Sequence, residues 1–558
     1  MSRHRADSQL APGIALAGIF VFHAVATLFW LRANSLPDGL QNEFIHLQRA
    51  VELFFRARDL GGSGLGELLW QDYYPPLLSV VGAATLALGA RSANALAASN
   101  LLWLGLLVAS VYALGRRTGS PWVGVLAAAL VCLYPSIFGN LRHHEPNLAL
   151  AALGAAAIWA LDASRNLSRT GPAVAFAVAV AAGLLADRVS MAPLVLAPAL
   201  TVVGAGLWRP GPVGRNGVVW RAALVVALIA AACAYYYVNF LTLHAGELTG
   251  QLAGEIDAQG THTEQRSPLS LAYWLYYLLA WFDMQMGTVL ALAAVAGVAA
   301  ALMRAREPGE ARGRLVLIWL LGGLAIFTLL GKKQPYYTLP LLPPAALLTA
   351  RWLLRLQPAG LRAGAVGVVL ALALLQWSAL SFAQPEPPER GPVAWLMGGS
   401  PVPESWIGYR FPQARPPKRH DLHWDEALAA IRDDGFDPDA DRLAVFGDLG
   451  EFYEGYMVPM ARLGLDTFQV DGVLLFPRVV REKESETDYF LFVTSDPDAS
   501  WPTEHHVART HEEFVPPWNG DPELIAALEQ MRGRATLLAD WEQGTGQRMY
   551  VYRLGGDP

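Results

Sequence analysis

The chain is poor in cysteine and in lysine. Two cysteines, Cys132 and Cys233, occur in 558 residues, and both lie within apolar runs. No disulfide framework is therefore expected, and both thiols are expected to be buried structural residues rather than reactive groups. Lysine occurs four times, and the net charge of −6 says little about partners. No nucleic-acid partner is expected.

Charged residues are also scarce, and long apolar runs take their place. Only 16% of residues are charged, 53% are hydrophobic, and the mean hydropathy is +0.30, as is typical of a polytopic membrane protein. Nearly all apolar runs precede about residue 383, after which the chain becomes charged and rich in turn residues. We therefore expect a membrane domain at 1–383, with juxtamembrane helices in an outer loop at 32–94, and a soluble α/β domain at 384–558.

About eleven stretches are long enough to cross roughly 30 Å of hydrocarbon as helices. They are residues 12–31, 95–115, 121–140, 146–163, 172–187, 190–208, 219–241, 286–303, 314–330, 338–356 and 363–382. The first could also be a cleaved signal peptide, because it follows Arg3 and Arg5 and contains Ala24-Val25-Ala26. Its length favours an uncleaved helix.

Arginine clusters predict the orientation of these spans. They fall on one side if the amino terminus is cytoplasmic, which places the carboxy-terminal domain outside the cytoplasm. If residues 74–90 were a span, the later arginine clusters would fall on the opposite side of the membrane. We therefore assign residues 74–90 to a re-entrant or surface helix and, for the same reason, residues 269–282 to an interfacial belt. The expected location is the bacterial inner membrane, with membrane lipids around the helices.

The first outer loop combines an acid with an aromatic-proline turn. Asn42 and Glu43 open a predicted helix whose apolar residues recur at helical spacing, with arginines between them. Such a helix is expected to lie on a membrane surface with its apolar face down. Tyr73 and Tyr74 precede Pro75-Pro76-Leu77, which starts another helix because proline is tolerated in a first turn.

A second acid, Glu145, precedes Pro146 at the expected start of a helix. It could be a capping group stabilised by the helix dipole. Paired with Glu43, it could instead perform acid–base or metal-assisted chemistry. The neighbouring His143 and His144 are either buried structural residues or ligands of a metal or phosphate.

A pair of lysines occurs at residues 331–337. Two of the four lysines, Lys332 and Lys333, occur together there, on the side where positive charge is disfavoured by topology. They suit an anionic headgroup such as a phosphate, or they are interfacial snorkelling anchors. Arg188 could add a guanidinium to the same phosphate or form a salt-bridged turn with Asp187.

The residues after 384 predict a small α/β domain. Helical patterns occupy 425–433 and 523–532, and strand patterns occupy 443–447, 489–494 and 549–552. The domain's sequence contains no phosphate loop, metal-ligand spacing or nucleophile elbow.

The arrangement of these motifs resembles that of the C-type membrane glycosyltransferases, in particular the protein O-mannosyltransferase and lipid A aminoarabinose transferase branch. The resemblance covers about residues 10–380. It rests on Asn42-Glu43, Tyr74-Pro75-Pro76-Leu77, Arg142 to Pro146, and Lys332 to Pro344.

This resemblance implies an enzyme that transfers a hexosyl or pentosyl group, with inversion, from a polyprenyl-phosphate carrier to a protein, lipid or glycan hydroxyl on the outer face. The leaving phosphate needs fixed positive charge, and the acceptor hydroxyl needs a carboxylate base. The catalytic candidates are Glu43 and Glu145. The phosphate-binding candidates are Lys332, Lys333, Arg188 and Arg142, and the substrate-binding candidates are Asn42, Tyr73, Tyr74, His143, His144 and Tyr337.

The chain departs from the family pattern at three places. Asn42 replaces the usual aspartate, so the base is Glu43 or Asp38, or the protein is catalytically impaired and acts as a scaffold. Glu145 replaces an aspartate, and Tyr73-Tyr74 replaces Glu-Lys. Metal use varies within the superfamily, so the sequence leaves the cofactor undetermined. A transporter or flippase for a lipid-linked saccharide is another alternative, although the spans lack the mid-membrane charges typical of one.

Overall fold

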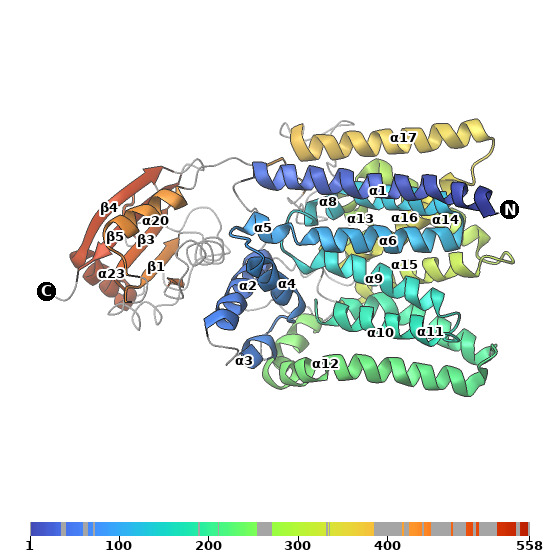
Figure 1. Ribbon diagram of the computed structural model, residues 1–558, viewed down its shortest axis with the longest axis horizontal. Helices are drawn as coiled ribbons and strands as arrows, with labels where there is room; N and C mark the ends of the chain where they lie inside the picture. The colour runs from blue at the N-terminus through green and yellow to red at the C-terminus, as the bar shows by residue number, and fades with distance from the viewer. Residues whose placement is uncertain are drawn as a thin grey trace. The chain divides into compact units, whose positions relative to one another are not determined.

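The computed structural model describes most of the chain as two compact units (Figure 1). The first comprises residues 1–30, 66–78 and 98–416, and the second comprises residues 31–65, 79–97 and 417–558. The described residues are 2–34, 41–59, 65–70, 73–187, 190–209, 211–253, 271–330, 333, 335–383, 414, 416–417, 423–437, 440–447, 470–472, 487–494, 498–501, 522–542 and 547–555.

The first unit is helical, and each of the eleven predicted spans contains a helix. Its longer helices, such as α1, α6 and α17, run along one common direction in Figure 1. The elements are α1 (Ser2–Ala33), α3 (Leu65–Trp70), α6 (Asn100–Thr118), α7 (Pro121–Leu133), α8 (Pro135–Asn140), α9 (Pro146–Ala163), α10 (Thr170–Leu184), α11 (Met191–Trp208), α12 (Gly214–Ala253), α13 (Leu271–Ala280), η1 (Trp281–Gln285), α14 (Thr288–Arg304), α15 (Ala311–Leu329), η2 (Pro335–Leu341), α16 (Leu342–Leu353), α17 (Ala359–Ser378) and η3 (Ala379–Ala383).

Seven helical stretches of the described chain are long and apolar enough to cross a membrane. They are Leu10–Ala33, Ala93–Thr118, Pro146–Ala163, Met191–Trp208, Gly214–Leu243, Ala311–Leu329 and Ala359–Ala383. The chain is therefore an integral membrane protein. Some predicted spans are shorter or divided. Residues 121–140 form two helices, because Pro135 restricts the preceding Tyr134 to an extended conformation with ψ 129°.

Glycines allow several of these helices to approach closely. A Cβ atom on Gly115 of α6 would lie 2.4 Å from the Cα of Gly124 in α7. A Cβ on Gly297 of α14 would lie 2.7 Å from the backbone nitrogen of Thr349 in α16. Small residues at such crossings bring backbones into contact, which explains why α16 is almost entirely enclosed by protein.

Ion pairs join the ends of several helices. Their arginines belong to the clusters that the sequence analysis used only to predict orientation. Asp162 at the end of α9 pairs with Arg117 of α6, and its carboxylate lies 3.5 Å from Nε of Arg312 in α15. Glu310, at the start of α15, lies 2.5 Å from Arg351 and 2.8 Å from Arg355. These arginines therefore also connect helices.

The second unit contains a five-stranded mixed sheet of order β2-β1-β3-β5-β4. Strands β2, β1 and β3 are parallel, whereas β5 pairs antiparallel with β3 and β4. The other described elements of this unit are two helices that cover the sheet and three that precede it in the chain, α2, most of α4 (Leu77–Ala87) and α5. The bounds are α2 (Gln41–Asp59), α5 (Ala93–Ala97), α20 (Trp424–Asp433), α23 (Pro522–Arg534), β1 (Leu443–Gly447), β2 (Val470–Gly472), β3 (Tyr489–Thr494), β4 (Ala535–Glu542) and β5 (Arg548–Leu554).

Strand alternation assigns α20 and α23 to opposite faces of the sheet. Leu491 and Val493 of β3 belong to the core beneath α20, and Phe490 and Phe492 to the core beneath α23. The predicted α/β character of the carboxy-terminal region is confirmed.

The helix α2 corrects one expectation. Its apolar face was predicted to rest on a membrane, but Leu47, Val51 and Phe55 are buried in a core that also contains Leu86 and Leu96. These last residues belong to α4 (Leu77–Ala87) and α5. The prediction was wrong because two apolar helices that follow in the sequence cover this face.

Candidate active site

The loop between α8 and α9 holds Glu145 in a buried position. Glu145 has an extended conformation before Pro146, as predicted, and is 1% exposed. Its carboxylate does not cap the helix. Instead, one oxygen accepts a hydrogen bond from Nδ2 of Asn147 at 2.8 Å. The structure therefore does not support the capping interpretation of this acid.

Three buried asparagines fix the backbone of this loop. Asn100 Nδ2 donates to the carbonyl oxygens of His143 at 2.5 Å and Asn140 at 3.1 Å. Asn147 Nδ2 also donates to Oδ1 of Asn140 at 3.1 Å. Burial of an amide is costly unless it is hydrogen-bonded, so these contacts stabilise one loop conformation. The sequence analysis assigned no role to these three asparagines, although Asn100 and Asn140 stand next to apolar runs.

Arg142 fastens this loop to other elements. Its guanidinium carbon lies 4.8 Å from the ring centroid of Trp30 and 5.1 Å from that of Phe138. Its Nη2 donates to Oγ of Ser381 at 2.6 Å. The side chain is 3% exposed, so Arg142 joins α1, α8 and η3. Phosphate binding by Arg142 stays a prediction.

The two histidines of the loop are also buried. His143 is 1% and His144 is 0% exposed, and the His143 ring lies 6.3 Å from that of Trp30. Within the part of the chain that the structure describes, no three His, Cys, Asp or Glu side chains are grouped as metal ligands.

Tyr336 of η2 lies among the phenols and carboxylates of the first unit. Burial raises its pKa well above the usual value, and negative charge on Tyr337, Glu145, Tyr74 and Asp187 raises the pKa further. Each of these four groups acts electrostatically on Tyr336, and we call the five residues the phenol–carboxylate cluster. The structure thus brings predicted Tyr74, Glu145 and Tyr337 together. It adds Tyr336 and the Asp187 carboxylate, which sequence reasoning did not assign to the site.

The Tyr73–Tyr74 turn is anchored by α12. The hydroxyl of Tyr236 donates to the carbonyl oxygen of Tyr73 at 2.8 Å, and that of Tyr237 donates to Leu184 at 3.1 Å. The backbone nitrogen of Leu77 also donates to the carbonyl oxygen of Leu185 at 2.8 Å. The turn is therefore held between α10 and α12.

Asp187 orients the start of α11. Its Oδ1 accepts a hydrogen bond from the backbone nitrogen of Ser190 at 2.9 Å. The carboxylate that contributes to the phenol–carboxylate cluster is therefore fixed by the backbone.

Lys333 is buried at the end of α15, with 2% of its surface exposed. Its ammonium donates to the carbonyl oxygens of Phe327 at 3.1 Å and of Thr328, and lies 4.0 Å from the ring centroid of Tyr273. The last carbonyls of a helix lack intrahelical partners, and a cation there is favourable. Burial lowers the pKa of Lys333 to about 8. Its contact with phosphate stays a prediction.

Several predicted residues lie outside the described positions: Asp38, Lys332, Arg188 and the side chain of Asn42. Glu43 is described and is 1% exposed at the start of α2 in the second unit. Its convergence with Glu145 stays a prediction.

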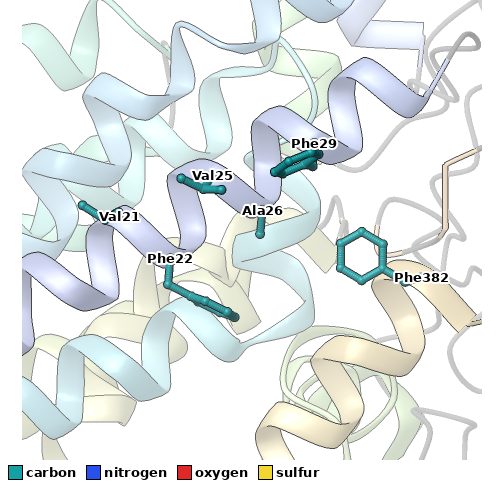
Figure 2. A pocket seen from close by; sticks show the side chains of 6 residues that line it. All are labelled: Val21, Phe22, Val25, Ala26, Phe29 and Phe382. Carbon is teal, nitrogen blue, oxygen red and sulfur yellow. The ribbon is translucent and has the colours of Figure 1, made fainter.

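A separate apolar groove of about 560 Å³ lies on the first unit between α1 and η3. Figure 2 shows Phe382 across this groove from side chains of α1. The lining carries no ionisable group, so the groove fits hydrocarbon rather than a reacting sugar. Its lining residues are Val21, Phe22, Val25, Ala26, Phe29 and Phe382.

No protein-family model matches the sequence, and no curated protein matched in a search. Solved structures do match. ArnT from Cupriavidus metallidurans bound to undecaprenyl phosphate is 15% identical, with a TM-score of 0.56 over 97% of this chain and 99% of that chain. The apo form of the same protein is 14% identical, with a TM-score of 0.57 over 97% of this chain and 99% of that chain.

The archaeal oligosaccharyltransferase AglB from Archaeoglobus fulgidus, in complex with an inhibitory peptide and a dolichol-phosphate, is 12% identical. The match has a TM-score of 0.52 over 96% of this chain and 74% of that chain. Together with the helical membrane unit and the terminal sheet, these matches show that the chain has the fold of the C-type membrane glycosyltransferases.

Proposed function

We propose that this chain transfers a sugar, with inversion, from a polyprenyl-phosphate carrier to a hydroxyl of a protein, lipid or glycan acceptor. The observation that carries the proposal is the burial of Glu145 in the phenol–carboxylate cluster, within a fold shared with ArnT bound to undecaprenyl phosphate and AglB with dolichol-phosphate. A buried carboxylate among phenols offers both a base and hydrogen-bonding groups for a sugar.

The reaction is a single displacement at the anomeric carbon. A glutamate carboxylate, Glu145 or Glu43, accepts the proton of the acceptor hydroxyl as the new carbon–oxygen bond forms. The bond between the anomeric carbon and the phosphate oxygen breaks on the opposite side, and the phosphate leaves with the polyprenyl chain. Positive charge stabilises this leaving group, for which we assign Lys332, Lys333, Arg188 and Arg142.

The tyrosines have a separate role in substrate binding. Tyr74, Tyr336 and Tyr337 supply hydroxyls that can bond to sugar hydroxyls, and aromatic faces that can pack on the sugar ring. Further contacts are assigned to Asn42, Tyr73, His143 and His144. We place the reaction on the outer face of a bacterial inner membrane, with the amino terminus in the cytoplasm.

The test is transfer from polyprenyl-phosphate-linked sugars by the full chain in nanodiscs. Glu145→Gln should lower the rate about 10²- to 10⁴-fold, the usual contribution of a general base. Glu542→Gln, at an exposed position of β4, is the matched control and should not change the rate. Full transfer by a folded Glu145→Gln variant would exclude Glu145 as the base, and flux of the donor without a covalent product would support transport instead.

A further inference from the structure

A series of buried hydrogen bonds leads from Glu145 into α8. The amide of Asn147, which donates to the Glu145 carboxylate, also donates to Oδ1 of Asn140 at 3.1 Å. Nδ2 of Asn140 in turn donates to the carbonyl oxygen of Ser136 at 2.7 Å. All four residues are at most 5% exposed. The position of the carboxylate is therefore tied to the first turn of α8.

The short helix η1 extends this series from α8 to η2. Oγ of Ser136 donates to the carbonyl oxygen of Met284 at 3.2 Å. The next residue, Gln285, donates through Nε2 to Oγ1 of Thr338 at 2.9 Å. Gln285 and Thr338 are both 0% exposed, and Thr338 lies in η2 directly after the two phenols of the cluster. Hydrogen bonds between buried groups thus connect the carboxylate to the helix that carries its phenol neighbours.

The backbone of η1 is suited to making contacts on two sides. It is a π-helix, in which the nitrogen of Met286 donates to the carbonyl oxygen of Trp281 at 3.0 Å, and such turns occur mostly at functional sites. The carbonyls of a last helical turn lack intrahelical partners, so that of Met284 can accept a bond from α8. Gly287 then has φ 76°, and an added Cβ would lie 1.9 Å from Nε2 of Gln376 in α17. The end of η1 is therefore fixed by its surroundings.

We infer that Gln285 is a positioning residue, which sets the place of Tyr336 and Tyr337 relative to Glu145 through its bond to Thr338. The carboxylate and the phenols come from separate parts of the chain, and η1 is bonded to both. A misplacement of about 1 Å can lower a rate about 10²-fold, so this connection matters for the reaction. The effect on catalysis rests on the proposed function, whereas the effect on the geometry of the site does not.

Matched substitutions in the full chain in nanodiscs test this role. Thr338→Val keeps the shape of the side chain but removes its oxygen, and Gln285→Met removes the amide. Each should lower kcat for transfer from a polyprenyl-phosphate-linked sugar about 10- to 100-fold, as expected for misplaced groups, while KM changes less. Thr338→Ser retains the hydroxyl and should restore most of the rate. Thr201→Val, at an exposed position of α11, is the control and should leave kcat unchanged.

The double variant and thermal unfolding separate positioning from simple stabilisation. Because one bond joins the two side chains, Gln285→Met/Thr338→Val should lower kcat no more than either single substitution does. A purely structural role predicts a lower unfolding temperature with an unchanged kcat in the folded variants, and that result would overturn the inference. Multiplicative effects of the two substitutions on kcat would overturn it as well.

A fluorine label on Tyr336 provides a measurement that needs no transfer. With 3-fluorotyrosine at position 336, Glu145→Gln should move the fluorine resonance, because charge on Glu145 acts on this phenol. In the Gln285→Met background the same substitution should move the resonance less, since the two groups are no longer held together. If the wild type transfers no sugar but this difference is seen, the proposed function fails and the positioning role stands. Equal movement in both backgrounds would refute the positioning role, even in a chain that transfers sugar.

Discussion

The ammonium nitrogen of Lys333 lies 3.1 Å from the carbonyl oxygen of Phe327. Lys333 lies two positions before Pro335, the first residue of η2, which carries Tyr336 and Tyr337, and it contacts the last turn of α15, which ends at Leu329. The hydroxyl of Tyr273 donates to the nearby carbonyl of Leu330 at 3.2 Å. Lys333 and Tyr273 therefore both bond to carbonyl oxygens at the end of α15.

The pH dependence of Lys333 separates its possible roles. Its pKa is lowered from 10.5 to about 8 in the folded chain, so the unfolded chain binds more protons between these values. The contribution of Lys333 to stability therefore rises as pH increases from about 8 to 10.5. If the ammonium also binds phosphate, transfer should fall over the same window while stability rises.

Lys333→Met removes the titrating group and serves as the comparison. Relative to the wild type, its transfer rate should be lower near neutral pH and should lack the decline above about pH 8. Transfer and thermal unfolding should be measured in parallel across this window. A wild-type transfer rate that does not decline there would restrict Lys333 to its structural role at the end of α15.

Glu310 should contribute more to stability than a surface carboxylate does. Burial alone would raise its pKa, but hydrogen bonds and charge from Arg355 and Arg351 lower it below 4.5. A lowered pKa means that this stabilisation is present above the ordinary value and is lost as pH falls through the folded value. Glu310→Gln should therefore destabilise the chain by about 3 kcal/mol at neutral pH, because Arg351 loses its charged partner.

The control for this prediction is the exposed pair between Arg548 and Asp540. Asp540→Asn should change the free energy of unfolding by less than about 1 kcal/mol. Thermal unfolding in detergent, at neutral pH and under acidic conditions, checks both variants. Equal effects of the two substitutions would contradict a special role for Glu310.

The strands of the sheet show which of them a local sequence pattern can predict. Strands β1 and β3 have the predicted bounds, because each is a short apolar run between polar residues. Strand β4 was missed because Ala535 follows Arg534 of α23 without a turn residue. Its alternate residues also do not divide into buried and exposed sets. At an edge with little burial, the pattern that indicates a strand is absent.

The candidate site shows that contacts between residues far apart in the sequence cannot be predicted from local patterns. The position of Glu145 was predicted correctly because Pro146 determines locally where α9 begins. The bond from Asn100 to the carbonyl of His143 joins residues 43 positions apart, and no local pattern encodes it. The capping role of Lys333 was missed for the same reason, since it depends on where α15 ends in space.

Contact between α6 and α7 predicts a steric effect. A Cβ on Gly115 would lie 2.4 Å from Cα of Gly124, a distance that packed backbones cannot accommodate without moving. Gly115→Ala should therefore lower the unfolding free energy by about 1–3 kcal/mol, the usual cost of overpacking. Gly18→Ala in α1 is the control, because nothing lies within 4 Å of its added Cβ. It should be neutral or stabilising in the same unfolding measurement.

Tyr236 is the final test of how the site is positioned. Its hydroxyl supports the carbonyl of Tyr73, whereas the adjacent Tyr235 is 60% exposed. Tyr236→Phe removes one hydrogen bond worth about 1 kcal/mol and should loosen the turn that carries Tyr74. We therefore expect a higher KM for the lipid-linked sugar with a smaller change in kcat, and no change in either constant for Tyr235→Phe. If the two variants gave the same KM, the bond to Tyr73 would have no part in substrate binding.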